Sequence, residues 1–282
     1  MMTRLRQAID DATHALGDAG VASPRTDAEE LAAYTAGTSR GRLPLVDSVD
    51  DDFFTRYDDL VATRAKRVPL QHIIGSVMFG PVTLEVGPGV FTPRPETEAL
   101  LEWAVAQDVP RNPVIVDLCT GSGALAIALA HHIPSARVIG VDNSADALTY
   151  ARRNAAGTLV ELRQADVYDP GIFDDLDGRV DFVVANPPYL PDATDLECEV
   201  AEHDPPQALF GGPDGTALVA AISRIAGRWL VDGGLLAIEH DETSSAAVCA
   251  LLRRSRLYDD VAGHHDFAGR PRFVTARRMI RS

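Results

Sequence analysis

Apolar residues near the start of the chain recur at the spacing of an amphipathic helix. Its apolar positions follow an i, i+4, i+7, i+11 pattern: Leu5, Ile9, Ala12 and Leu16. Gly17 and Gly20 come directly after this face and favour the end of the helix. The pattern therefore predicts an N-terminal helix that buries one face.

Two more helices follow in the first ~65 residues. Ser23 suits the N-cap of the second helix. Pro24 suits its first position, because the N–H that proline lacks would have no partner within the helix there. Its apolar residues are Ala28, Leu31, Ala32 and Tyr34. A third helix is expected over residues 53–67, with Leu60 and Val61 buried. A helical unit of this size buries little surface, so it is expected to pack on a larger domain or a partner.

A change of pattern separates this helical part from the rest. Between residues 75 and 90, glycine and proline alternate with Val82, Leu84 and Val86, which predicts a short hairpin. We therefore predict a helical, partner-recognition domain at 1–74, a β-hairpin linker at 75–92 and an α/β domain at 93–282.

Short apolar runs then alternate with helical patterns. The expected helices span residues 96–107, 123–132, 145–156, 216–230 and 242–253. The expected strands span residues 114–118, 137–141, 159–162, 180–185, 235–239, 257–262 and 272–278. This alternation predicts a doubly wound α/β fold with a mostly parallel sheet. The last two strands have hairpin spacing, so one of them must be antiparallel.

Composition narrows the possible partners and location. The chain has 282 residues and a formal net charge of −15, which disfavours binding to DNA because no basic stripe compensates for it. Its three widely spaced cysteines suggest neither a disulfide framework nor a zinc site. No stretch is long and apolar enough to cross a bilayer. We expect a monomeric cytoplasmic protein without a metal, and surface or structural roles for the pairs His131-His132 and His264-His265.

One apolar strand runs directly into Asn186-Pro187-Pro188-Tyr189. The prolines end the strand and hold Asn186 outside helical geometry, at the sheet edge where ligands bind in open α/β folds. A primary amide can hold another planar NH2 group edge to edge. For Asn-Pro-Pro alone, an ordinary strand-ending turn with an asparagine cap is an equal alternative.

A glycine-rich turn upstream decides between these interpretations. The strand at residues 114–118 leads into Gly121-Ser122-Gly123 and an Ala/Leu helix, whose free N–H groups can face a ligand. Asp142 follows about 20 residues after Gly123, which suits a bond to ribose hydroxyls. The third glycine of G-x-G-x-x-G is missing, so an adenosine-type cofactor is favoured over a dinucleotide.

These motifs resemble those of class I S-adenosylmethionine-dependent methyltransferases, and more narrowly the release factor glutamine methyltransferases of the HemK/PrmC family. The stretches that match this family are residues 69–75, Phe91-Thr92-Pro93-Arg94-Pro95-Glu96-Thr97-Glu98, residues 205–209, Gly211-Gly212-Pro213-Asp214-Gly215 and residues 266–274. Of these, the stretch from Pro93 to Glu98 is the most specific, since Asn-Pro-Pro-Tyr also occurs in DNA adenine methyltransferases. The resemblance extends from about residue 65 to the end.

The resemblance implies the fold and the activity. It implies a mostly parallel seven-stranded sheet, S-adenosylmethionine as cofactor, and class I peptide chain release factors as protein substrates. The reaction would methylate the amide nitrogen (N5) of the glutamine in their Gly-Gly-Gln motif. The alternatives are an adenine-N6 methyltransferase acting on DNA or RNA, a nucleotide-dependent oxidoreductase, and an adaptor without catalytic activity.

The resemblance also implies roles for individual residues. The expected cofactor-binding residues are Asp117, Cys119, Thr120, Gly121, Ser122, Gly123, Asp142, Asp166, Val167 and Asn186, and the expected catalytic residues are Asn186, Pro187, Pro188 and Tyr189. Asp117 would face the cofactor's ammonium, Asp142 its ribose, and Asp166 with Val167 its adenine. Relatives usually have glycine in place of Cys119. We therefore expect this loop to keep the shape of the relatives' loop only if φ of Cys119 is negative. For Arg94 and Glu96, helix-opening structural roles are favoured over substrate binding.

Overall fold

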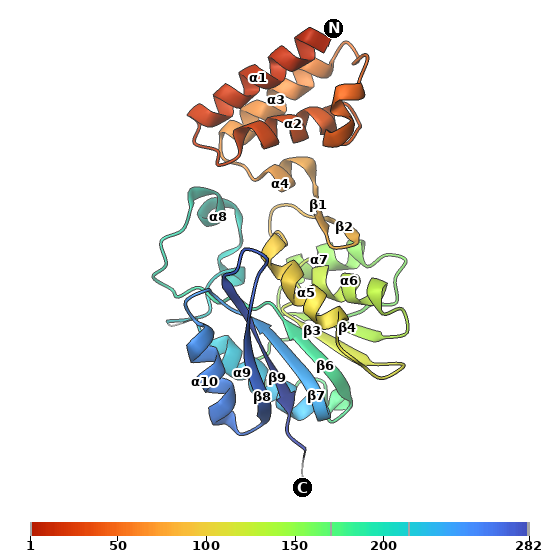
Figure 1. Cartoon of the computed structure of the whole chain (residues 1–282), viewed down its shortest axis with the longest axis vertical. Helices are drawn as coiled ribbons and strands as arrows, with labels where there is room; N and C mark the ends of the chain where they lie inside the picture. The colour runs from red at the N-terminus through yellow and green to blue at the C-terminus, as the bar shows by residue number, and fades with distance from the viewer. Residues whose placement is uncertain (1, 170, 214, 281–282) are drawn as a thin grey trace. The chain divides into compact units, whose positions relative to one another are not determined.

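The computed structural model describes residues 2–169, 171–213 and 215–280 (Figure 1). Asp214 of the Gly-Gly-Pro-Asp-Gly match lies outside the described residues. The chain divides into two compact units, and the smaller one combines Met1–Ser76 with Leu196–His203. The larger unit consists of Val77–Asp195 and Asp204–Ser282. A short segment that follows Asn-Pro-Pro-Tyr in the sequence therefore belongs to the helical unit.

Three helices form the body of the smaller unit: α1 (Met2–Asp18), α2 (Pro24–Thr35) and α3 (Phe53–Ala65). The predicted apolar face of α1 is confirmed, because Leu5, Ile9, Ala12 and Leu16 are buried in one core. Shorter elements complete the unit: η1 (Arg40–Leu45), α4 (Leu70–Ile74) and α8 (Cys198–His203).

In the helical prediction, the N-cap position of Ser23 and the first position of Pro24 are confirmed, whereas the burial of Leu60 was wrong. Ser23 occupies the N-cap of α2 but makes no side-chain capping hydrogen bond, since its backbone is not in the extended conformation that aims the hydroxyl at the helix. Leu60 is only partly buried, because Phe53 and Tyr57 fill the centre of the core instead. The Tyr57 hydroxyl donates to the Ala28 carbonyl at 3.0 Å, which satisfies the buried phenol.

A buried ion network ties the helical unit together. Arg64 is 5% exposed and donates to Asp27 at 2.7 Å and to Glu199 at 2.9 Å. Arg67 donates to the same Glu199 oxygen at 2.7 Å. Arg64 also donates to the Val68 carbonyl, so its buried guanidinium is well satisfied.

The larger unit begins with the predicted hairpin, β1 (Ser76–Phe79) and β2 (Val82–Glu85), which forms its own two-stranded sheet. A seven-stranded sheet follows in the order β5-β4-β3-β6-β7-β9-β8. Its strands are β3 (Val114–Leu118), β4 (Arg137–Asp142), β5 (Glu161–Gln164), β6 (Val180–Ala185), β7 (Leu230–Glu239), β8 (Tyr258–His265) and β9 (Pro271–Arg278). β9 runs antiparallel to both neighbours, which confirms the prediction for the tail.

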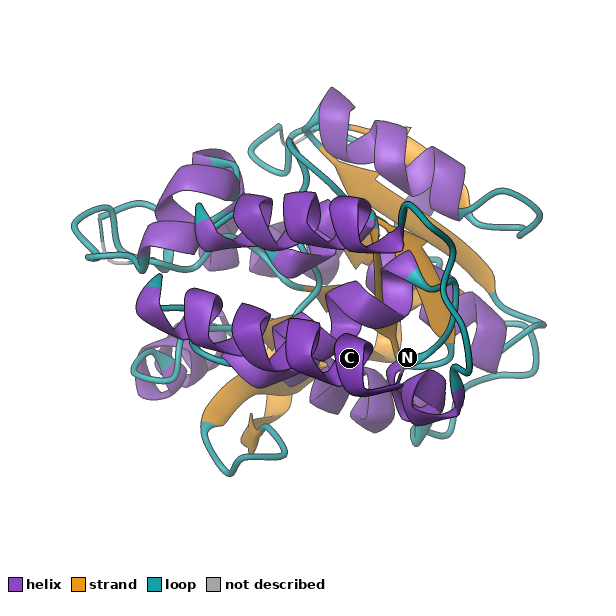
Figure 2. Ribbon diagram, turned by 90° about the horizontal axis from the view of Figure 1, so that it is seen from above, coloured by secondary structure: helices purple, strands orange, loops and turns teal. Residues whose placement is uncertain are grey.

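Helices cover both faces of this sheet (Figure 2). Those of the larger unit are α5 (Glu98–Val105), α6 (Ala124–His132), α7 (Ala145–Asn154), α9 (Ala217–Trp229) and α10 (Ser245–Ser255). Alternate residues of the central strands enter two separate cores: Val183 packs with α9 and α10, whereas Phe182 and Val184 pack with α5 and α6. The doubly wound, mostly parallel α/β fold is thus confirmed.

Some boundaries of helices and strands differ from the predicted ones where the local sequence pattern competes with packing. The strand expected at 159–162 is β5 at Glu161–Gln164, and Leu159 is 88% exposed. One turn of 3-10 helix, η2 (Pro95–Thr97), precedes α5, because Pro95 and the extended Arg94 before it delay the regular helix. Two further 3-10 turns, η3 (Asp174–Leu176) and η4 (Pro206–Ala208), were not predicted.

Candidate active site

The order of strands brings the two main motifs together. In the sheet, β3 lies between β4 and β6. The order of strands reverses here, because β4 and β5 lie on one side of β3 whereas β6 lies on the other. Leu118 and Ala185 are register partners, and each is the last residue of its strand. The loop that begins at Cys119 and the motif that begins at Asn186 therefore leave the sheet side by side.

Asp117 lies beneath the first loop and is almost fully buried. Its Oδ2 accepts hydrogen bonds from the Thr120 hydroxyl at 2.6 Å and from the Ala126 amide at 3.1 Å. Burial raises the pKa of Asp117 to about 7 despite these bonds. Its Oδ1 and the Ser122 hydroxyl are buried without partners among the described residues. An unpaired buried carboxylate oxygen is suited to a cationic ligand group such as an ammonium.

Cys119 has a left-handed backbone with φ of 60°, so the condition under which the loop would keep its shape is not met. A non-glycine residue in this region is strained, because Cβ approaches the following carbonyl. Burial raises the pKa of the Cys119 thiol further above its ordinary value, and the carboxylates of Asp142, Asp117 and Asp166 add to the shift. The thiol is thus held in its neutral form and is no candidate nucleophile.

Asp142 ends β4 and shapes the same loop. Its Oδ2 accepts from the Gly121 amide at 2.8 Å, and its Oδ1 accepts from the Ser144 amide at 2.8 Å. Burial raises the pKa of Asp142, while the backbone bonds oppose the rise. A carboxylate still has lone pairs left for ligand hydroxyls after two such bonds.

Asp166 is exposed, and among the described residues its carboxylate accepts a hydrogen bond only from the Tyr168 amide, at 2.9 Å. Val167 is buried. The structure therefore brings Asp117, Cys119, Asp142 and Asp166 around one loop, and their residue types fit a ligand with an ammonium group and ribose hydroxyls. These assignments stay predictions.

Asn186 is half-buried at the end of β6, and its Nδ2 donates to the Thr97 hydroxyl oxygen at 3.2 Å. Pro187 is buried behind it. The Tyr189 hydroxyl donates to Glu239 at 3.3 Å. Burial and the nearby Glu239 carboxylate raise the pKa of Tyr189, so the phenol is neutral.

A second loop fixes the backbone of the motif. Leu190 and Phe210 form a parallel bridge, and the Gly211 amide donates to the Leu190 carbonyl at 2.9 Å. Gly215 has φ of 70°, and a Cβ there would overlap the Tyr189 carbonyl oxygen. Glycine is required at this position for both reasons, which explains the last glycine of the Gly-Gly-Pro-Asp-Gly segment.

Comparison with known proteins identifies the family. Residues 7–75 match the family described as PrmC N-terminal domain, and residues 82–203 match the Methyltransferase small domain. The Release factor glutamine methyltransferase of Mycobacterium leprae is 61% identical over 99% of this chain and 98% of its own length. This chain belongs to the release factor glutamine methyltransferase family.

Two further matches, one to a curated protein and one to a solved structure, are more distant. A 4-amino-L-phenylalanine/4-methylamino-L-phenylalanine methyltransferase from Streptomyces pristinaespiralis is 40% identical over 88% of this chain and 87% of its own. A methyltransferase structure from Pyrococcus furiosus has a TM-score of 0.56 at 17% identity. The aligned region covers 78% of this chain and 100% of the chain in that structure. The structure comparison supports the fold alone.

In this member of the family, sequence reasoning missed four residues near Asn186 and Tyr189. They are Thr97, Glu239, Asp266 and Arg272. Burial raises the pKa of Glu239 to about 7, against the opposing effects of the nearby Thr97 hydroxyl, the charge of Arg272 and the hydrogen bond from Tyr189. Arg272 in turn pairs with Asp266 at 3.4 Å. The matches at residues 93–98 and 266–274 were the available signal, but they did not indicate that both reach the Asn-Pro-Pro-Tyr motif.

The remaining candidates have structural contacts. Arg94 pairs with buried Asp204 at 2.6 Å and lies over the Phe91 ring, in agreement with a structural role. His264 stacks on Phe273 and contacts the Thr275 hydroxyl at 2.8 Å. Within residues 2–169, 171–213 and 215–280, no cluster of His, Cys, Asp or Glu could hold a metal ion, and no helix could span a membrane.

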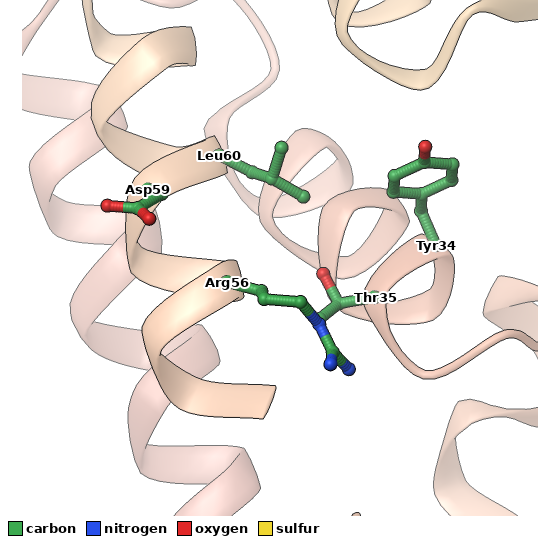
Figure 3. A pocket seen from close by; sticks show the side chains of 5 residues that line it. All are labelled: Tyr34, Thr35, Arg56, Asp59 and Leu60. Atoms are coloured by element: carbon green, nitrogen blue, oxygen red, sulfur yellow. The ribbon is translucent and has the colours of Figure 1, made fainter. Parts of the chain in front are cut away.

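The helical unit of this family member has a surface pocket of its own, of about 470 Å³. Figure 3 shows its lining: Tyr34 and Thr35 from α2, and Arg56, Asp59 and Leu60 from α3. Tyr34 is 49% exposed at this pocket. None of the predicted cofactor or catalytic residues lines it.

Proposed function

We propose that this protein transfers a methyl group from S-adenosylmethionine to the side-chain amide nitrogen of the glutamine in the Gly-Gly-Gln motif of class I release factors. The observation that supports it most is the placement of Asn186, whose amide NH2 is engaged by Thr97 at the ligand-binding edge of the sheet. This leaves the Asn186 carbonyl oxygen as an acceptor for another planar NH2 group. The family and its 61% identical relative support glutamine as the owner of that group.

The cofactor would be held by the loop after β3 and by the ends of β4 and β5. Asp117 Oδ1 would accept from its ammonium, Asp142 would bind its ribose hydroxyls, and Asp166 with Val167 would contact its adenine. The backbone from Cys119 to Gly123 would enclose the methionine portion. When bound, the cofactor supplies an electrophilic methyl group on a sulfonium, and the sulfur is a good leaving group because it departs as a neutral thioether.

Asn186 Oδ1 and the Pro187 carbonyl would accept the two hydrogens of the substrate amide. The nitrogen lone pair, normally shared with the carbonyl group, is then oriented toward the methyl group. Pro188 stiffens the motif, and Tyr189 forms a wall beside the substrate side chain. Positioning supplies most of the catalysis in this scheme, since no side chain needs to remove a proton first. The methyl–sulfur bond breaks as the methyl–nitrogen bond forms, the sulfur leaves as a neutral thioether, and the methylated nitrogen then loses one proton to solvent.

We also propose that the helical unit recognises the protein substrate. It has its own core, none of the proposed cofactor or catalytic residues, and a pocket with exposed Tyr34. A Tyr34→Ala variant should methylate an intact release factor more slowly, while its rate on a short Gly-Gly-Gln peptide stays unchanged. Leu159→Ala, at an exposed position of the larger unit, is the matched control. Equal rates of all three proteins on the intact factor would refute this role.

We place the reaction in the cytoplasm, with the enzyme as a monomer and without direct binding of nucleic acid. The reduced cysteines and the net charge of −15 support this placement.

Mass spectrometry tests the proposed reaction. A release factor incubated with enzyme and cofactor should gain one methyl group on the motif glutamine, and a factor with Gln→Ala at that position should gain none. The arylamine named for the Streptomyces relative and an adenine-containing DNA serve as parallel acceptors. Methylation of either one, with the release factor unmodified, would overturn the assignment.

A further inference from the structure

Thr97 lies between the motif asparagine and a buried carboxylate. Its hydroxyl oxygen accepts from Asn186 Nδ2 at 3.2 Å, and the same side chain lies close enough to Glu239 to lower the pKa of that carboxyl. Glu239 Oε2 is buried without a hydrogen-bond partner among the described residues. Thr97 is 3% exposed and Glu239 is 1% exposed, so water does not compete for these bonds. The three residues come from η2, the end of β6 and the end of β7.

The direction of these bonds follows from the number of hydrogens. An ionised carboxylate only accepts, and Glu239 Oε2 is buried without a partner, so we assign the single hydroxyl hydrogen of Thr97 to this oxygen. The Thr97 oxygen can then only accept, and Asn186 must present its NH2 group to it. This orientation directs the opposite atom, Asn186 Oδ1, away from Thr97.

We propose that Glu239 and Thr97 are positioning residues, which set the orientation of the Asn186 amide so that its carbonyl oxygen faces the acceptor NH2 group. The inference deepens the proposed function, because it depends on Asn186 as the group that binds the acceptor. It assigns a role to the family-specific Pro93-to-Glu98 stretch, which contains Thr97.

The carboxylate itself is held by charged and polar neighbours. Tyr189 donates to Glu239 Oε1, and Arg272 lies close enough to Glu239 and Tyr189 to influence both. Asp266 pairs with Arg272, and Glu96 is the other acidic group that acts on Glu239. In this assignment the same carboxylate accepts from two hydroxyl groups, Tyr189 at Oε1 and Thr97 at Oε2.

Protonation of Glu239 reverses the chain of bonds. With its pKa raised to about 7 by burial, Glu239 becomes a donor at lower pH. Thr97 can then donate toward Asn186, which favours the flipped amide with NH2 facing the acceptor. The flipped amide repels a substrate NH2 group, so kcat should fall about tenfold for each pH unit below this pKa.

The test compares Thr97→Val, Thr97→Ser and Glu239→Gln as full-length proteins on a release factor, at saturating cofactor. Thr97→Val should lower kcat by about ten- to a hundredfold, with the cofactor Kd unchanged, and Thr97→Ser should restore most of it. The acidic limb of the kcat profile near pH 7 should disappear in Thr97→Val and Glu239→Gln. Saturating cofactor keeps Asp117 ionised through its ammonium, so that residue does not produce the same limb.

Thr275→Val is the matched control, since it removes a buried threonine hydroxyl from β9 of the same unit. It should change neither kcat nor the pH profile. A Thr97→Val enzyme with wild-type kcat, or one that keeps the acidic limb, would overturn the inference. A wild-type enzyme that methylates no release factor would instead refute the proposed function.

Discussion

Arg64 and Glu199 form a hydrogen-bonded ion pair at 2.9 Å although they are separated by 135 positions in sequence. Glu199 belongs to the segment Leu196–His203, which lies between Asn-Pro-Pro-Tyr and the second supporting loop in sequence but is part of the helical unit. The folding of that unit therefore includes residues from the middle of the larger unit's sequence. A fragment that begins near residue 76 would leave this segment without its partners Arg64 and Arg67.

Arg64→Ala should destabilise the helical unit strongly. It leaves Asp27 buried without its positive partner, and the loss of one member of a buried pair costs about 3–5 kcal/mol. Glu199→Gln should cost less, about 1 kcal/mol, because Glu199 is partly exposed. Hydrogen exchange of α2 and α3 measures both effects. Glu202→Gln, on the same short helix but exposed, is the control, and equal protection in all variants would contradict the role of the network.

Asn186→Ala should abolish methyl transfer and leave the cofactor Kd within about tenfold, which corresponds to ~1.4 kcal/mol. The reason is that, in the proposed reaction, Asn186 binds the acceptor amide and only borders the cofactor. Single-turnover kinetics and calorimetry measure the two quantities. Turnover near the wild-type rate would exclude Asn186 from catalysis.

Asp142→Ala should weaken cofactor binding. Each lost hydrogen bond to a charged group contributes roughly 1.5–3 kcal/mol, and the Gly121 amide also loses its acceptor. Calorimetry with S-adenosylmethionine measures the change. Asp169→Ala, at an exposed position, should bind normally, and an unchanged Kd in Asp142→Ala would place the ribose elsewhere.

Cys119→Gly should relieve the left-handed strain at the start of the loop after β3, whereas Cys119→Ala should keep it. Both variants remove the thiol, so their difference isolates the backbone. We expect the glycine variant to be more stable by about 1 kcal/mol in urea unfolding. A more stable alanine variant would show that φ at this position is not the source of strain.

The affinity for cofactor should rise with pH through about 7, because burial raises the pKa of Asp117 to that value from 3.8 and only the ionised form pairs with an ammonium. The free energy of unfolding should change with pH in the opposite direction. A carboxyl with a raised pKa stabilises the folded protein when protonated, and this contribution is lost as pH rises from about 4 through about 7. Calorimetry at pH 6 and pH 8 checks the affinity, and Asp117→Asn should bind weakly with little dependence on pH.

The sequence by itself determined the main helices and strands and the place of the glycine-rich turn after β3, because these depend on local properties. Apolar periodicity located the strand Val114–Leu118, and the two prolines after Asn186 ended β6 where expected. β5 was misplaced by two residues, since a short, partly exposed strand has little periodicity to mark its ends.

Only the tertiary structure decided which distant side chains support the motif. Thr97, Glu239 and Arg272 are separated by long stretches of chain, and no local pattern states that η2, β7 and β9 meet at Asn186 and Tyr189. The left-handed backbone of Cys119 is likewise a product of the loop, since the residue type alone favours negative φ. Hydrogen-bond direction depends on which groups are buried together and on their ionisation, and burial of this kind exists only once the sheet has formed.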